Sequence, residues 1–299
     1  MHTTLVQDNL DFSSSFSFHQ TVPIRPVLLP RVEVPEAFYG EGFAVVDAIA
    51  SPEAARAYLE GLIASVDATR LPLYLRFAGR VQLASETCIP TCAAIVETTF
   101  QGLHFDMGLP ITTPSPQVVQ LLLALYRPLT GPYSQAATRV VPLRRLLSQR
   151  RWSSEHELET RVVDYANRHG DGWERPKRVN TYRLACLARL IDSADGSTDM
   201  IDRRDVATGL EFRDAGNDER RSLQNEYSFF EKHGMDVSAV ERQVRLEPGQ
   251  LLVVDNTRAA HGRVGKRRER EMWHYLFGVP SASPEDIDEV RHEVLRQFI

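Results

Sequence analysis

A histidine and an aspartate that share one side of an expected strand are the first residues in this sequence that could do chemistry. They belong to the triplet His104-Phe105-Asp106. Because residues i and i+2 of a strand point to the same side, His104 and Asp106 could present an imidazole nitrogen and a carboxylate oxygen to one ion. These are two of the three ligands of the 2-His-1-carboxylate facial triad, which holds Fe(II) and leaves other coordination positions open. A triplet this short also arises by chance, so its context must decide.

A second triplet of the same type, His169-Gly170-Asp171, tests that context. It lies in the polar segment NRHGDGWE, whose two glycines are typical of a loop in which no strand fixes the side chains. The first triplet instead ends an apolar, strand-like run, and a rigid element of that kind can aim its ligands. The pattern therefore favours His104 and Asp106 as the ligand pair.

The third ligand must be a histidine remote in the sequence, and His261 is the candidate. It follows a Glu247-Pro248-Gly249 turn, the apolar run QLLVVD at 250–255 and a second polar turn. An ordinary surface histidine after a loop would show the same local pattern. From these residues alone both interpretations stay open.

The segment EPGQLLVVDNTRAAHGR at 247–263 resembles the distal-histidine region of Fe(II)- and 2-oxoglutarate-dependent oxygenases of the taurine dioxygenase and clavaminate synthase superfamily. In that region a Pro-Gly turn leads through an apolar strand to Asp-Asn and then to His-Gly-Arg. The separation of 157 positions from His104 to His261, with a lid-like insertion between them, also matches the superfamily's layout. The resemblance extends over about residues 100–278. It implies that His104, Asp106 and His261 bind Fe(II), with 2-oxoglutarate and O2 as cosubstrates.

The resemblance also implies an arginine, on the strand after the distal histidine, that pairs with the distal carboxylate of 2-oxoglutarate. Arg270 is the first choice, since a planar guanidinium forms a bidentate pair with a carboxylate. Arg267 and Arg268 are close competitors. The resemblance further suggests Thr138 as the hydroxyl partner of the same carboxylate, although it could equally be an ordinary strand residue.

The activity implied is hydroxylation of a small polar or amino-acid-like metabolite, with release of succinate and CO2. Related halogenases carry a small residue at the position of Asp106, so its carboxylate argues against halogenation. Desaturation and cyclisation by the same fold stay open. So do a protein- or nucleic-acid-directed oxygenase that docks through basic residues such as Arg144 and Arg145, and an O2-independent, metal-bound cupin-type enzyme.

Short β-prone runs must position these residues. Runs of strand type (LYLRF, GRVQLA, AAIVETTF and LHFDM) occupy 73–107, and the β signal returns at 244. A helix is expected after Ser51, with Pro52 and Glu53 in its first turn, and another near residue 142. Two β-rich blocks around a long insertion favour a mainly β, α+β fold over alternating βαβ units. We expect a double-stranded β-helix (jelly-roll, cupin-like) core with peripheral helices and a helical and loop lid.

Composition places the chain among ordinary globular proteins. It has 299 residues, a formal charge of −5 and 42% hydrophobic residues. We expect one domain, with an irregular arm at 1–30, the lid-like insertion at about 152–240 and a C-terminal helix at 283–299. The spacing of the three cysteines suits neither a zinc site nor a disulfide framework.

The N-terminal segment and the apolar runs of the sequence indicate the expected location and partners. The N-terminus has no secretory signal pattern, and the most apolar window, 118–126, is too short to span a bilayer. We therefore expect a cytoplasmic protein with a small-molecule substrate and with neither a nucleic-acid nor a membrane partner. The sequence does not specify an oligomeric state.

Overall fold

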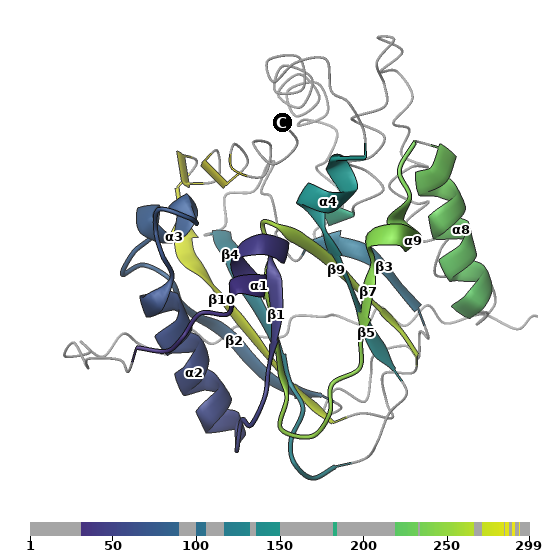
Figure 1. The fold of residues 1–299 in the computed structure, drawn as a ribbon. Helices are drawn as coiled ribbons and strands as arrows, with labels where there is room; N and C mark the ends of the chain where they lie inside the picture. The colour runs from purple at the N-terminus through teal and green to yellow at the C-terminus, as the bar shows by residue number, and fades with distance from the viewer. Residues whose placement is uncertain are drawn as a thin grey trace, which may run out of the picture.

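Two antiparallel sheets form the centre of the protein (Figure 1). The computed structural model describes residues 31–89, 100–105, 117–131, 136–149, 182–183, 219–232, 234–265, 271–283, 285–286, 289–290 and 293. Sheet A consists, in spatial order, of β1 (Phe43–Val46), β8 (Leu251–Asp255), β4 (Gln117–Tyr126), β10 (Met272–Ala282) and β2 (Gln82–Ile89). Sheet B consists of β6 (Tyr182–Arg183), β3 (Phe100–Phe105), β9 (Ala259–Val264), β5 (Ala137–Pro142) and β7 (Arg242–Val244).

The helices lie beside these sheets. They are α1 (Glu36–Glu41), α2 (Pro52–Ser65), α3 (Pro72–Arg76), α4 (Leu143–Leu147), α8 (Glu219–Lys232) and α9 (Val237–Val240). Figure 1 shows α2 and α3 beside sheet A, and α8 beside sheet B. The mainly antiparallel α+β class expected from the sequence is thus confirmed. The expected arm at 1–30 and most of the expected insertion at 152–240 lie outside the described residues.

One apolar cluster lies between the two sheets. Residues from both sheets meet in it, for example Leu123 and Leu252 of sheet A with Val140 of sheet B. Successive side chains of a strand alternate between its two faces. Membership of this cluster therefore marks the inner face of each strand, and the neighbouring positions face the helices outside.

Helix α2 forms as its sequence predicts. Ser51 has an extended backbone and its hydroxyl accepts a hydrogen bond from the Ala54 amide at 3.1 Å, which satisfies one free N–H of the first turn. Leu59 and Leu62 are fully buried on the side that faces the sheet. No helix in the described part of the chain is long and apolar enough to cross a membrane.

The run LYLRF at 73–77 is a helix rather than the strand its composition suggests. Pro72 occupies the first turn of α3, where its missing N–H costs nothing. Leu73 and Tyr74 are buried in succession and Leu75 is exposed, which is not the strict alternation of a half-buried strand. The prediction of a strand there was wrong. A run of five residues is too short to show whether its apolar residues follow the period of a helix or that of a strand.

Asp286 connects the C-terminal region to the body of the protein. Its carboxylate accepts two hydrogen bonds from Arg80, at 2.9 and 2.6 Å, and one from the Ser283 amide. The Ser283 hydroxyl in turn accepts a bond from the Asp286 amide, as in a helix capping box. The hydrogen bonds from Arg80 lower the pKa of Asp286 to about 2, although burial opposes them.

This lowered pKa makes part of the stability pH-dependent. The carboxylate contributes fully above its ordinary pKa of 3.8, and its contribution is lost as the pH falls towards 2. We expect Asp286→Asn to lower the free energy of unfolding by about 1 kcal/mol at pH 7. The difference from the wild type should shrink between pH 4 and pH 2 in urea unfolding. Glu36→Gln, which breaks the exposed pair with Arg70, should cost less, and equal costs would contradict this assignment.

Candidate metal centre

The two histidines singled out in the sequence stand opposite each other on adjacent strands. His104 of β3 is the register partner of His261 of β9, and His261 is in turn the partner of Val140 on β5. Residues directly opposite in an antiparallel pair share one face of the sheet, and Val140 belongs to the inner cluster. Both imidazoles therefore point into the space between the sheets. They are 4% and 6% exposed, respectively.

A β-bulge lies immediately before His104. Gln101 stands opposite Arg263 and His104 opposite His261, so Gly102 and Leu103 together face the single residue between those partners. An extra residue of this kind bends the strand and re-aims the side chains beside it. The bulge thus sets the direction in which His104 leaves β3.

The hydrogen bond of the His104 ring fixes its tautomer. Nδ1 lies 2.8 Å from the carbonyl oxygen of Gly102. Because a carbonyl oxygen only accepts hydrogen bonds, Nδ1 carries the proton, and in the neutral ring Nε2 keeps its lone pair. Histidines that bind metals typically donate their other ring N–H to a backbone carbonyl in this manner. The neutral His104 ring would therefore bind a metal through Nε2.

The spacing of the two rings also suits a shared ion. Their centroids are 4.4 Å apart and their planes are tilted by 51°. With a metal–nitrogen bond of about 2.1 Å, each ring centroid would lie about 3.2 Å from the ion. Two imidazoles that bind the ion at a nitrogen–metal–nitrogen angle of about 90° would then have centroids about 4.5 Å apart. Among the residues that the structure describes, no group of three or more His, Cys, Asp or Glu side chains gathers for a metal. Asp106, the expected third ligand, lies outside the described residues.

A hydroxyl and a guanidinium share this inner face with the histidines. Arg263 follows His261 by two positions on β9 and is therefore on the same side of the strand. Its register partner on β5 is Thr138. Both residues are buried. The register thus places Arg263 beside Thr138, and a guanidinium with a neighbouring hydroxyl suits a carboxylate. Arg267, Arg268 and Arg270 lie outside the described residues.

Sheet A presents a polar strip toward the same space. His274 of β10 stands opposite Leu125, which belongs to the inner cluster, and opposite Thr87 on its other side. Ser85 lies two residues before Thr87, and their hydroxyl oxygens are 3.5 Å apart. This strip adds groups that can hydrogen-bond a polar molecule to the apolar residues of the inner face of sheet A.

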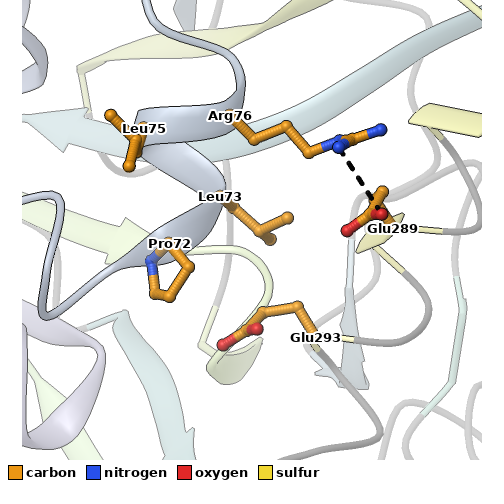
Figure 2. Close-up of a pocket in the computed structure, with 6 residues that line it drawn as sticks. All are labelled: Pro72, Leu73, Leu75, Arg76, Glu289 and Glu293. Carbon is orange, nitrogen blue, oxygen red and sulfur yellow. Dashed lines mark ion pairs between the residues drawn. The ribbon is translucent and has the colours of Figure 1, made fainter.

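A surface pocket of about 360 Å³ lies elsewhere, between α3 and the C-terminal region (Figure 2). Figure 2 shows Leu73 and Pro72 on one side and Glu289 and Glu293 on the other, with an ion pair of 3.6 Å between Arg76 and Glu289. Its lining includes none of the residues that the sequence singled out for chemistry. The histidine pair therefore remains the candidate centre.

Sequence reasoning missed a buried charge cluster on the outer face of sheet B. Arg139 of β5 is fully buried and pairs with Glu226 of α8 and with Glu241. Burial alone would lower the pKa of Arg139, but the two carboxylates raise it above the ordinary value of an arginine. Burial, with the nearby charge of Glu241, raises the pKa of Tyr227 to about 12. The available signal was an arginine inside the apolar run ATRVV, because a buried cation requires acidic partners.

Comparisons with known proteins assign no family to the chain. No protein-family model and no curated protein matches it. Among solved structures it is similar to PvcB, described as an Fe, alpha-ketoglutarate dependent oxygenase from an isonitrile synthetic pathway, with 14% identity over 84% of this chain and 97% of that chain and a TM-score of 0.35. A crystal structure of PvcB from Pseudomonas aeruginosa shows 16% identity over 76% of this chain and 82% of that chain, with a TM-score of 0.34. The function is therefore argued from the candidate centre itself.

Proposed function

We propose that this protein is an Fe(II)- and 2-oxoglutarate-dependent oxygenase that hydroxylates a small polar or amino-acid-like metabolite. The observation that carries the proposal is the buried, inward-facing pair of His104 and His261, with ring centroids 4.4 Å apart. The hydrogen bond from Nδ1 of His104 to Gly102 adds the required tautomer. An imidazole pair of this kind supplies two of the three protein ligands of a facial triad.

Asp106 completes the proposed triad. It follows His104 by two positions, so continuation of the strand would turn its carboxylate to the side of the imidazoles. Three ligands on one face of Fe(II) leave positions for 2-oxoglutarate and O2. Iron bound there would supply the oxidising chemistry that converts 2-oxoglutarate to succinate and CO2 while the substrate is oxidised.

The remaining residues orient the reactants and exclude water. Thr138, with Arg270 as the first choice of arginine, anchors the distal carboxylate of 2-oxoglutarate in this proposal, and the buried Arg263 beside Thr138 is a second candidate anchor. The apolar cluster on the inner face of sheet A keeps water from the reacting atoms. The strip of Ser85, Thr87 and His274 offers hydrogen bonds to a polar substrate.

The proposal includes a finer view of the fold. The two antiparallel sheets would be the two halves of a double-stranded β-helix, with the metal between them. The organisation of residues 1–299 as one domain, with the insertion at about 152–240, stays a prediction.

Coupled turnover tests the proposed function. The protein, reconstituted with Fe(II) without oxygen, would be given 2-oxoglutarate, O2 and a panel of amino acids and related metabolites. We expect a substrate to stimulate O2 consumption and succinate formation together, with a product heavier by one oxygen atom. A product lighter by two hydrogens would indicate a desaturase or cyclase. Turnover without O2 would support the cupin-type alternative, and salt-sensitive binding of nucleic acid would favour a macromolecular substrate.

Arg270→Ala tests the carboxylate anchor. Because it removes a bidentate, charge-assisted pair, we expect the KM for 2-oxoglutarate to rise about 10- to 100-fold, with a much smaller change in the KM for the substrate. Thr138→Val keeps the shape and removes a single uncharged donor, so a smaller rise of about 3- to 10-fold is expected. Arg267→Ala and Arg268→Ala are the matched controls. An unchanged cosubstrate KM in Arg270→Ala would move the anchor to one of these residues or to Arg263.

A further inference from the structure

The bulge before His104 is held from outside the sheet by a side chain of α8. The Leu103 amide, which belongs to the bulge, donates a hydrogen bond of 2.8 Å to Oε1 of Glu226. The carbonyl of Gly102, the other bulge residue, accepts from the His104 ring. One backbone group of the bulge thus contacts the histidine that the bulge aims, and the other contacts a carboxylate that lies 123 residues further along the chain.

The carboxylate of Glu226 is itself fixed in place. Its second oxygen, Oε2, accepts a hydrogen bond of 2.5 Å from the guanidinium of Arg139. Arg139 is held on its other edge by Glu241, through bonds of 3.0 and 2.6 Å to the two oxygens of that carboxylate. The side chains of Arg139, Glu226 and Glu241 are 0%, 2% and 3% exposed. Because each oxygen of Glu226 has its own partner, rotation of the carboxylate would break one of the two contacts.

This network lies behind the metal centre and not in it. Arg139 alternates on β5 with Thr138 and Val140, which belong to the inner face, so its side chain points outward to α8. Leu103 likewise alternates with the inward-facing His104 and packs with the outer apolar residues. Glu226 therefore touches neither the space between the sheets nor a molecule bound there, and it acts on the centre only through the backbone of β3.

We propose that Glu226 is a positioning residue that holds the bulge of β3 and thereby aims the imidazole of His104 at the metal. The inference rests on the proposed function for its consequence, which is tighter metal binding. Its structural part, the fixing of residues 100–105 by Glu226, belongs to the metal-free protein. The loss of Glu226 therefore weakens metal binding although every metal ligand remains.

If Glu226 only neutralised Arg139, its substitution and that of Glu241 would have the same effect on β3 and on metal binding. Glu241 provides the matched control, because it pairs with the same guanidinium at similar distances, and the amide of Leu103 is held by Glu226. Glu226→Gln provides the conservative variant: its one amide oxygen can still accept the bond from Leu103, whereas its NH2 group cannot accept the bond from Arg139 and the charge is removed.

The test measures two properties of Glu226→Ala, Glu226→Gln and Glu241→Ala. The first is amide hydrogen exchange of the segment 100–105 in metal-free protein, and the second is the dissociation constant for Co(II) as a spectroscopic substitute for Fe(II). We expect Glu226→Ala to speed exchange of this segment and to raise the Co(II) dissociation constant about 10- to 100-fold, the usual effect of losing a group that orients a metal ligand. Glu241→Ala and Glu226→Gln should each change it by well under 10-fold.

The outcomes separate this inference from the proposed function. Equal acceleration of exchange in Glu226→Ala and Glu241→Ala would overturn the positioning role. If Glu226→Ala does not fold, weak Co(II) binding by a folded Glu226→Gln would overturn it as well. Selective acceleration in Glu226→Ala supports the role, and if wild-type protein then binds neither Co(II) nor Fe(II), the proposed function fails while the fixing of the bulge by Glu226 stands.

Discussion

The His104→Ala variant is expected to lose tight binding of Fe(II) and all 2-oxoglutarate-dependent turnover while it keeps its fold. Loss of a residue that only orients a ligand typically weakens metal binding 10- to 100-fold, so loss of a ligand should exceed about 100-fold. His261→Ala and Asp106→Ala should behave in the same way, because a facial triad needs all three donors. Anaerobic Fe(II) titration measures the affinity, and release of CO2 from labelled 2-oxoglutarate measures the turnover.

His274→Ala is the matched control for this loss. It also removes an imidazole from the inner face, but from the polar strip of sheet A, opposite Leu125 and Thr87. We expect its Fe(II) affinity to stay near that of the wild type, whatever its effect on turnover. Circular dichroism and thermal unfolding of metal-free protein check that each variant is folded. A folded His104→Ala protein with normal Fe(II) affinity would disprove the ligand assignment.

Arg139→Ala is expected to produce the largest loss of stability among single substitutions on the outer face of sheet B. It leaves Glu226 and Glu241 buried without the cation that both contact. Breaking a buried charge pair typically costs 3–5 kcal/mol, because a buried charge is left without compensation. Since whole domains are stable by only about 5–15 kcal/mol, the variant should lose a large part of its free energy of unfolding and unfold at a much lower urea concentration. Urea unfolding followed by circular dichroism measures the change.

Two further variants show whether charge burial is the cause. Arg145→Ala breaks the ion pair between Arg145 and Glu41, whose arginine side chain is 51% exposed, and should cost less than about 1 kcal/mol. Arg139→Met combined with Glu226→Gln and Glu241→Gln removes all three charges at nearly constant volume. This triple variant should recover a large part of the stability that Arg139→Ala loses. A stability as low as that of Arg139→Ala would show that packing, and not charge, dominates at this site.

His104 could be singled out from strand periodicity and its apolar context, whereas the choice of His261 rested on the resemblance of segment 247–263 to the distal-histidine region of the oxygenases. The triplet at 104–106 ends an apolar run, and the apolar strand before His261 is bounded by turn residues on both sides. Two strands of this kind can pair across any separation along the chain, and the structure places His104 opposite His261. Thr138, which the resemblance suggested as a carboxylate partner, lies on β5 opposite Arg263.

The support behind His104 could not be inferred in the same way. A bulge adds one residue to one strand and depends on how two distant segments align, and here only Gly102 hints at it. Glu226 lies in a helix that is polar for most of its length, so nothing local separates it from its solvated neighbours. Its burial arises only when α8 packs against β3 and Arg139, which are remote in sequence.

Helices were predicted correctly where several local sequence signals agreed, and missed where the signals were few. The helix α2 was predictable from a cap, a first-turn proline and a helical apolar period that runs through Leu59 and Leu62. The shorter α3 offered a first-turn proline but no side-chain cap, and its composition, rich in leucine and aromatic residues, suits strands and helices alike.

The location of iron in the protein tests the central claim most directly. Crystals grown without oxygen in the presence of Fe(II) and 2-oxoglutarate would be measured on both sides of the iron absorption edge. We expect one anomalous peak between the sheets, about 2.2 Å from Nε2 of His104, from a ring nitrogen of His261 and from a carboxylate oxygen of Asp106. Iron bound at any other place, or imidazoles of His104 and His261 that do not share an ion, would contradict the account.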